Sequence, residues 1–214
     1  MTLSVREHVV DDSRADILRA AAECFMERGY NATSIDDVAR RLGATKGRIY
    51  HHFHSKADLF AEVYRTGMEM NYAAIEPLRT QSLPTIEKWR RMATAHTYQM
   101  IRTRPFQRAV WEGVELTLRG ATTPEQRKVL GELLEYRTQY GNMFREVIAQ
   151  GEREGRMRFP NLSIANQMAM MTLNSPIFWY STRPGETEDD LASIVAQVVQ
   201  CSLRGLGCME AMAA

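Results

Sequence analysis

Basic side chains are concentrated in one short stretch of the first quarter of the chain. Residues 38–57 contain no Asp or Glu, but they contain Arg40, Arg41, Lys46, Arg48 and Lys56, and the histidines His51, His52 and His54. Cations grouped in this way bind polyanions, because each cation brought to a phosphate displaces condensed counterions. The grouping predicts a local phosphate-binding surface. The alternative interpretation is a solvated basic face on an ordinary helical domain.

The charge of the whole chain gives no such signal. The 214 residues include 27 Lys and Arg against 26 Asp and Glu, for a formal net charge of +1. A protein that bound nucleic acid through bulk charge would be strongly basic. Any phosphate-binding surface is therefore confined to the stretch described above.

The segment before this stretch has the pattern of a short amphipathic helix. Its apolar residues fall at i, i+3, i+4 and i+7, on one face of a helix: Ile35, Val38, Ala39 and Leu42. Ser34 and Asp37 have the spacing of a capping box at its start, and Gly43 supplies the permissive backbone that ends it. Both ends of the helix are thus predicted from local sequence.

A second short helix is predicted directly after the glycine. Thr45 is placed to cap it, and Ile49 and Phe53, four residues apart, face inward. The first turn, Lys46-Gly47-Arg48, is then left on the exposed face, as insertion into a DNA major groove requires. Two short helices joined by a glycine turn predict a helix-turn-helix, and we expect the protein to bind DNA.

Ser55 is placed to cap a third helix, with Lys56 in its first turn. A positive charge there is unfavourable for the helix dipole, so we expect a phosphate against this helix end.

Almost all of the remaining sequence has helical periodicity. We predict an all-α chain of about nine helices, with no sustained strand alternation. The predicted domains are a flexible arm at 1–12, a helix-turn-helix DNA-binding domain at 13–60, and a ligand-binding and dimerisation bundle at 61–214. At 44% hydrophobic residues the chain has enough apolar side chains for a sizeable core.

The sequence has no pattern typical of a signal peptide, a membrane span or a Cys-x-x-Cys redox motif. Residues 1–13 contain no apolar core of a signal peptide, and no apolar run approaches the roughly 18 residues of a membrane span, so a cytoplasmic location is expected. Cys24, Cys201 and Cys208 form no Cys-x-x-Cys pair and are expected to be reduced thiols.

The first quarter of the chain resembles the TetR family of one-component transcriptional regulators. The resemblance lies in Thr33-Ser34-Ile35-Asp36-Asp37-Val38-Ala39, Gly43, Gly47, Ile49-Tyr50-His51-His52-Phe53, Ser55-Lys56 and Leu59. It implies three N-terminal helices that bind DNA and a larger domain that binds a ligand and dimerises, with the last two helices in an intersubunit four-helix bundle.

The resemblance also implies roles for individual residues. Lys46, Gly47 and Arg48 match the base-contacting start of the recognition helix. Phosphate-contacting positions are matched by Thr33, Tyr50, His52 and Lys56, with His51 between the two roles and Thr45 completing the candidate set. Arg48 departs from the small Thr or Ser of many relatives. It could bind a guanine edge bidentately or fold back onto a phosphate.

The larger domain is rich in Met and aromatic side chains, which suit either an adaptable apolar pocket or an ordinary core. We expect a small hydrophobic effector among Trp89, His96, Met100, Trp111, Tyr140, Phe144, Met171 and Asn174. A similarity of residues 174–207 to family members that respond to acyl-CoA and steroid-degradation thioesters suggests an acyl-CoA-like compound.

A homodimer is expected through the last helix. One stripe of that helix, with small residues at its end, consists of Leu191, Ile194, Val195, Val198, Ser202 and Gly205. A two-fold dimer would place two recognition helices about 34 Å apart and predicts a palindromic operator. The predicted function is a repressor released from this operator by its effector.

Two other functions compete with this prediction. An enzyme would use His51, His52 and His54 as metal ligands, or Glu112 and Glu115 with His96, but the chain has no His-Glu-x-x-His, phosphate-binding glycine loop or nucleophile elbow. No cofactor or metal is therefore predicted. A DNA-binding protein without an effector is the other alternative, because a helical domain need not contain a cavity.

Overall fold

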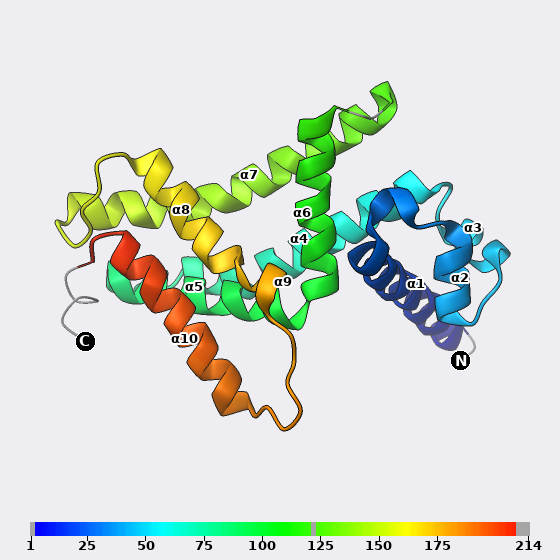
Figure 1. Ribbon diagram of the computed structural model, residues 1–214, viewed down its shortest axis with the longest axis horizontal. Helices are drawn as coiled ribbons and strands as arrows, with labels where there is room; N and C mark the ends of the chain where they lie inside the picture. Colours follow the sequence, from blue (N-terminus) through cyan, green and yellow to red (C-terminus); the bar gives the residue numbers. More distant parts are fainter. Residues whose placement is uncertain (1–2, 121–122, 209–214) are drawn as a thin grey trace. The chain divides into compact units, whose positions relative to one another are not determined.

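The computed structural model describes residues 3–120 and 123–208, with side chains from Ser13 onwards. These residues contain helices and no strands (Figure 1). The helices are α1 Leu3–Ala32, α2 Ile35–Leu42, α3 Lys46–His52, α4 Lys56–Arg79, α5 Thr85–Arg102, α6 Arg104–Arg119, α7 Pro124–Arg153, α8 Leu162–Asn174, α9 Pro176–Trp179 and α10 Glu188–Gly205. Because α9 is a single turn of four residues, the predicted count of about nine helices is confirmed for this part of the chain.

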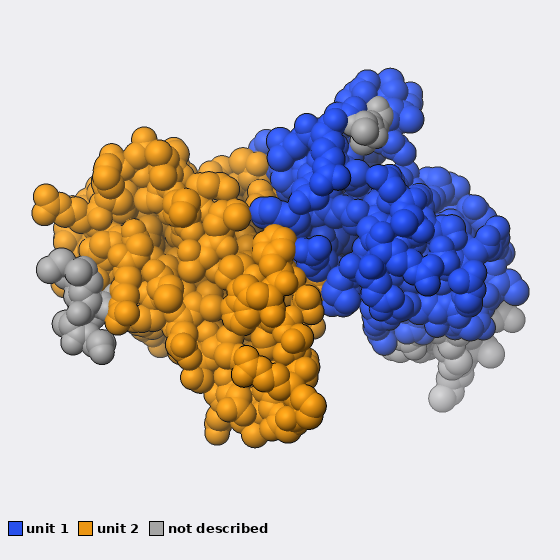
Figure 2. Space-filling model, viewed as in Figure 1, with its two compact units in different colours: residues 1–68, 105–135 blue, residues 69–104, 136–214 orange. Residues whose placement is uncertain are grey.

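The described chain forms two compact units (Figure 2). Unit 1 consists of residues 1–68 and 105–135, and unit 2 of residues 69–104 and 136–214. Helices α4 and α7 therefore each contribute residues to both units. Among the described helices none combines the length and apolar character needed to cross a bilayer.

In unit 1, α2 forms as its sequence predicts. The Ser34 hydroxyl accepts the backbone N–H of Asp37, and the Asp37 carboxylate accepts the N–H of Ser34 at 2.9 Å, which completes the capping box. Gly43 ends α2 in the left-handed conformation at φ 64°, which favours glycine. Ile35, Val38 and Ala39 are buried, so the predicted packing face is confirmed.

Two details at helix starts differ from the predictions. Thr45 is the N-cap residue of α3, but its hydroxyl makes no capping hydrogen bond, and its carbonyl oxygen alone accepts the N–H of Arg48 at 3.1 Å. Helix α1 begins at Leu3, so most of the predicted arm at 1–12 is helical. No Gly or Pro between residues 3 and 12 interrupts the helix. Residues 1 and 2 of that arm lie outside the described residues.

In unit 2, α5, α8 and α10 pack against one another. The buried face of α5 carries an apolar stripe, with Trp89, Ala93, Met100 and Ile101 at helical spacing. Buried side chains of α7, including Tyr140 and Phe144, complete this core. The unit thus surrounds the single buried histidine of α5, His96.

Candidate DNA-binding surface and effector site

The exposed side of α3 carries a cluster of polar and basic residues. This recognition surface consists of Lys46, Gly47, Arg48, Tyr50 and His51. Ile49 and Phe53, on the opposite side of the same segment, are 0% and 1% exposed and hold α3 against the core. The predicted division of α3 into a buried and an exposed side is confirmed. The exposed side has the composition that a helix entering a major groove needs.

Lys46 forms an ion pair with Asp36, which lies just before the basic stretch of residues 38–57. Its ammonium lies 2.6 Å from the carboxylate of Asp36 on α2, and both side chains are about half exposed. Pairs of this exposure contribute little to stability, because water and salt screen them. A phosphate approaching Lys46 would therefore compete with Asp36 at small cost.

Arg48 has a neutral partner instead. Its Nε donates to the Ser13 hydroxyl of α1 at 3.1 Å, and the same oxygen lies 3.5 Å from His52 Nε2. Burial, assisted by His51, Arg14 and Arg48, lowers the pKa of His52. The pattern of the sequence did not point to Ser13 or Asp36 as parts of this surface, because each comes from a different helix.

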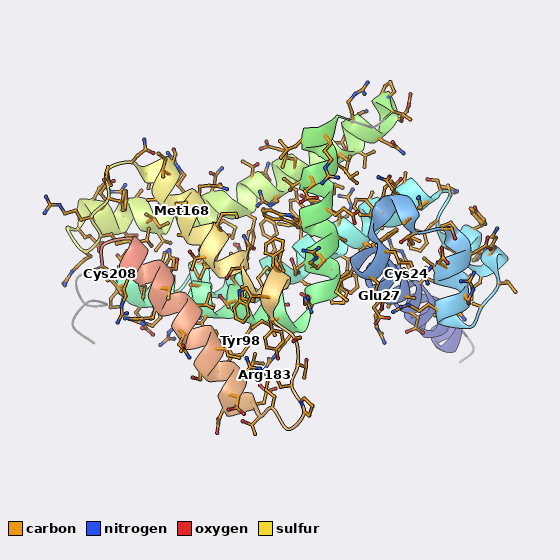
Figure 3. All side chains as sticks on the ribbon, viewed as in Figure 1. Cys24, Glu27, Tyr98, Met168, Arg183 and Cys208 are labelled. Atoms are coloured by element: carbon orange, nitrogen blue, oxygen red, sulfur yellow. The ribbon has the colours of Figure 1, made fainter. Side chains whose placement is uncertain are left out.

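Two of the basic residues predicted near DNA are held by acids of their own domain. Arg41 pairs with Glu27 and, at 2.9 Å, with Glu23 of α1 (Glu27 is labelled in Figure 3). Arg40 lies 3.1 Å from Asp37. These pairs give the two arginines a structural contact that charge clustering alone did not predict.

The ammonium of Lys56 makes contacts within its own domain that the sequence did not predict. Its ammonium donates to the carbonyl oxygens of Tyr30 at 2.8 Å, Asn31 at 3.4 Å and Thr33 at 2.9 Å, and it lies 4.4 Å from the centre of the Tyr30 ring. The positive charge in the first turn of α4 is thus explained by the carbonyl groups of residues 30, 31 and 33, and no phosphate is needed to account for it.

Thr33 is likewise an internal contact. It is 2% exposed, and its hydroxyl donates to the carbonyl oxygens of Gly29 at 2.8 Å and Cys24 at 3.2 Å. A side chain buried in this way cannot hold a phosphate without a rearrangement. The remaining predicted phosphate positions, Tyr50 and His52, are exposed and half-buried respectively.

Seven of the eight predicted effector residues belong to unit 2, and Trp111 belongs to unit 1. Trp111 donates its indole N–H to Glu115 at 3.1 Å. In unit 2, His96 is bonded at both ring nitrogens, with the Tyr140 hydroxyl 2.8 Å from Nδ1 and the Asn174 Oδ1 3.1 Å from Nε2. The structure therefore joins His96, Tyr140 and Asn174, from α5, α7 and α8, into one polar cluster.

One arrangement of protons satisfies both hydrogen bonds of this cluster. The Asn174 oxygen accepts, so His96 donates from Nε2, and Nδ1 accepts from the Tyr140 hydroxyl. Burial lowers the pKa of His96 to about 4 and raises that of Tyr140 well above its usual value. Both side chains are therefore neutral at pH 7. Phe144 packs on the His96 ring at 5.6 Å between ring centres.

Trp89 differs from its neighbours in this core. Its side chain is 0% exposed, and its indole Nε1 has no hydrogen-bond partner among the described residues. An unpaired buried donor costs about 1 to 3 kcal/mol. It is a free hydrogen-bond donor on the same face of α5 as His96, seven residues away.

The predicted dimer stripe is mostly internal to one chain. Leu191, Val195, Val198 and Ser202 are buried in the packing of α10 on α5 and α8, so these side chains are not available to a partner in this structure. An amphipathic helix buries its apolar face wherever apolar surface is nearest, and here the same chain supplies it. Of the predicted set, Ile194 is half-buried and Gly205 is exposed.

The exposed apolar residues of unit 2 lie elsewhere. On α8, Ile164 and Met168 are 63% and 62% exposed and four residues apart (Met168 is labelled in Figure 3). On α9, Phe178 and Trp179 are 45% and 50% exposed. We call these four residues the apolar face of unit 2. In the described part of the chain, no three His, Cys, Asp or Glu side chains are grouped as metal ligands.

Comparison with known families matches two segments of the chain. Residues 17–63 match the family model described as bacterial regulatory proteins, tetR family, and residues 82–203 match the model described as tetracyclin repressor-like, C-terminal domain. The second match alone covers more than half of the 214 residues.

Individual relatives agree with this result. The transcriptional repressor KstR2 of Mycobacterium tuberculosis is 26% identical over 178 residues, 82% of this chain and 84% of KstR2. Matches to two other curated regulators span only 32% and 30% of those proteins. These relatives are transcriptional regulators and not enzymes.

Two solved structures show the same fold. The regulator PfmR from Thermus thermophilus has a TM-score of 0.72 and 27% identity over 89% of this chain and 98% of PfmR. AibR in complex with isovaleryl coenzyme A and operator DNA has a TM-score of 0.67 and 20% identity over 86% of this chain and 97% of AibR.

Proposed function

Because this chain belongs to the TetR family of bacterial regulators, we propose that it is a homodimeric transcriptional repressor that binds a palindromic operator and releases it when a hydrophobic effector binds. The observation that carries the DNA-binding part is the recognition surface, where basic and polar residues are exposed on a helix whose other side is fully buried. Its site of action is the cytoplasm, where its operator lies.

We assign the DNA-binding domain to residues 13–60 and the effector and dimer functions to residues 61–214. The recognition surface lies entirely in the first of these segments. Within this segment, Arg48 and His51 are the candidates for base contacts, Thr45, Tyr50 and His52 for phosphate contacts, and Lys46 for a contact with either a base or a phosphate. These residues are exposed or half-buried in the free protein, as contact with DNA requires.

The effector site is proposed at the His96 cluster of unit 2. An apolar ligand needs few but well-placed polar partners. Asn174 and Tyr140 could each exchange their bond with His96 for a bond to a ligand, and the unpaired indole N–H of Trp89 could bind a ligand oxygen. A thioester has such an oxygen beside an apolar chain. The AibR complex makes an acyl-CoA the first class of compound to test.

The dimer is proposed to form through the apolar face of unit 2 and the exposed side of α10. Large apolar side chains at this level of exposure favour association with another apolar surface. Ala192 and Ala196 are exposed on α10, and small residues permit the close approach of a partner helix.

The thermodynamic linkage between effector binding and DNA binding gives the decisive experiment. A DNA fragment selected by the protein from a random pool would be titrated in a calorimeter, with and without an acyl-CoA series and free aromatic compounds. An effector that weakens DNA binding must itself be bound more weakly by the DNA complex, and by the same factor. A change from 99% to 1% DNA-competent protein requires a preference of about 5.5 kcal/mol. Ligands that bind with equal affinity in both conditions would support a DNA-binding protein without effector control.

A further inference from the structure

The connection between α1 and α2 is a sharply bent segment whose backbone groups need partners. Gly29 has φ 78° and ψ 162°, which interrupts the helical geometry before the last residues of α1. The bend leaves peptide N–H and C=O groups without their usual intrahelical partners. We call residues 29–33 the α1–α2 corner. Helix α2 begins at Ile35, immediately after it.

One of these groups is held by a carboxylate from α6. The backbone N–H of Tyr30 donates to Glu112 Oε1 at 2.5 Å. A Cβ atom placed on Gly29 would lie 3.2 Å from the same oxygen, so the carboxylate also packs closely on the bend itself. Glu112 is partly buried, and burial raises its pKa. This carboxylate is therefore committed to the corner.

The other side of the same residue is held from α4. The carbonyl oxygen of Tyr30 accepts from Lys56 Nζ at 2.8 Å. Burial lowers the pKa of Lys56, and the charge of Glu112 acts in the opposite direction. Tyr30 is thus bound at its N–H by an acid of α6 and at its C=O by a base of α4.

Helices α4 and α6 also pack on each other with little free space. A Cβ atom on Gly113 would lie 2.6 Å from the ring of Tyr64, and one on Gly67 would lie 3.2 Å from the carbonyl oxygen of Phe106. Contacts as close as 2.6 Å are not tolerated without a shift. Helices α4 and α6 are therefore in close contact, and Glu112 and Lys56 reach the corner from two helices that pack directly on each other.

From these contacts we infer that Glu112 is a positioning residue which, together with Lys56, fixes the α1–α2 corner and thereby the orientation of α2 and the recognition surface. This inference rests on the proposed function only in one respect, because its test includes a measurement of DNA affinity. From the sequence alone, Glu112 is a candidate only for the alternative catalytic site with Glu115 and His96. Its partner Tyr30 is 82 residues away, and nothing in the local pattern marks the pair.

Two substitutions of Glu112 separate the effect of side-chain length from the effect of side-chain charge. Glu112→Gln keeps an oxygen at the same position, whereas Glu112→Asp keeps the charge and withdraws it by one methylene. Glu115→Gln is the matched control, because Glu115 lies on the same helix but binds Trp111 and Arg119. The full-length variants would be compared by backbone amide hydrogen exchange at Tyr30 and by affinity for the DNA that the unchanged protein selects from a random pool.

We expect Glu112→Asp to lower the protection of the Tyr30 amide and the DNA affinity about tenfold each, the effect of losing one hydrogen bond to a charged group. Glu112→Gln should stay within about threefold of the unchanged protein, and Glu115→Gln should change neither quantity. Full protection of the Tyr30 amide in Glu112→Asp would overturn the contact itself. Lost protection of the Tyr30 amide with unchanged DNA affinity would overturn the positioning role. If the unchanged protein selects no DNA, that result counts against the proposed function, and the exchange data still test the contact between Glu112 and Tyr30.

Discussion

Arg48 Nε lies 3.1 Å from the hydroxyl oxygen of Ser13, which ties the recognition helix to α1 through an uncharged partner. Among the residues described from Ser13 onwards, Ser13 is the one hydrogen-bond partner of the Arg48 side chain. An arginine held at Nε keeps its two terminal nitrogens in a fixed plane. That geometry suits bidentate contact with the O6 and N7 atoms of guanine.

Arg48→Ala should therefore reduce discrimination at one base pair of the operator by about 1 to 3 kcal/mol, while binding to other sequences changes little. Ser13→Ala should produce a weaker loss at the same base pair, because the guanidinium becomes mobile. Competition binding with single-base variants of the operator measures both effects. Ser163→Ala, an exposed serine of α8, is the control. If Ser13→Ala affects all base pairs equally, Ser13 does not position Arg48.

Lys46 and Lys56 should respond differently to removal. Lys46→Ala should weaken binding to all DNA sequences and reduce the slope of log affinity against log salt by about 0.9, the value for one phosphate. Lys56→Met should leave that slope unchanged and lower the free energy of unfolding by about 1 to 3 kcal/mol, because three carbonyl oxygens lose their donor. DNA titrations at several salt concentrations and urea unfolding test the pair. A reduced slope for Lys56→Met would restore its predicted phosphate contact.

The sequence predicted those features that depend on residues close together in the chain. The Ser34 and Asp37 capping box, the glycine end of α2 and the buried side of α3 each depend on a few consecutive residues. Local hydrogen bonding and helical periodicity determine such features whatever the rest of the chain does.

Contacts between distant residues could not be predicted in the same way. Ser13 and Arg48 are 35 residues apart, and Lys56 meets carbonyl groups 23 to 26 residues earlier, so the positions of whole helices decide them. The stripe of α10 shows a related limit. Periodicity shows that the side of α10 with Val195 and Val198 is buried. It does not show whether the same chain or a partner subunit covers that side.

The buried histidine predicts a specific dependence of stability on pH. Burial lowers the pKa of His96 to about 4, whereas in the unfolded chain it is near 6.5. The stabilising contribution of neutral His96 is therefore complete above about pH 6.5 and is lost as the pH falls towards 4. The loss amounts to roughly 3 kcal/mol. Urea unfolding of the protein and of His96→Gln between pH 7 and 4 measures it.

The His96→Gln variant should be less stable at pH 7, since Tyr140 and Asn174 lose their partner, but it should lose less stability on acidification. The difference between the two pH profiles isolates His96 from the exposed His51 and His54, which both proteins retain. Parallel profiles would contradict the neutral, buried state of His96.

The apolar face of unit 2 and the buried stripe of α10 make opposite predictions for two arginine substitutions. Met168 is 62% exposed, so Met168→Arg should leave the fold and melting temperature nearly unchanged but should convert a dimer to a monomer. Val198 is buried in its own chain, so Val198→Arg should destabilise the protomer itself by several kcal/mol, as an unpaired buried charge does. Sedimentation velocity and thermal unfolding distinguish these results. If Val198→Arg is a folded monomer and Met168→Arg remains a dimer, the dimer forms through the α10 stripe and not through the apolar face of unit 2. Because two half-sites must be bound at once, the Met168→Arg monomer should also lose most of its affinity for a palindromic operator while keeping its weak affinity for a single half-site.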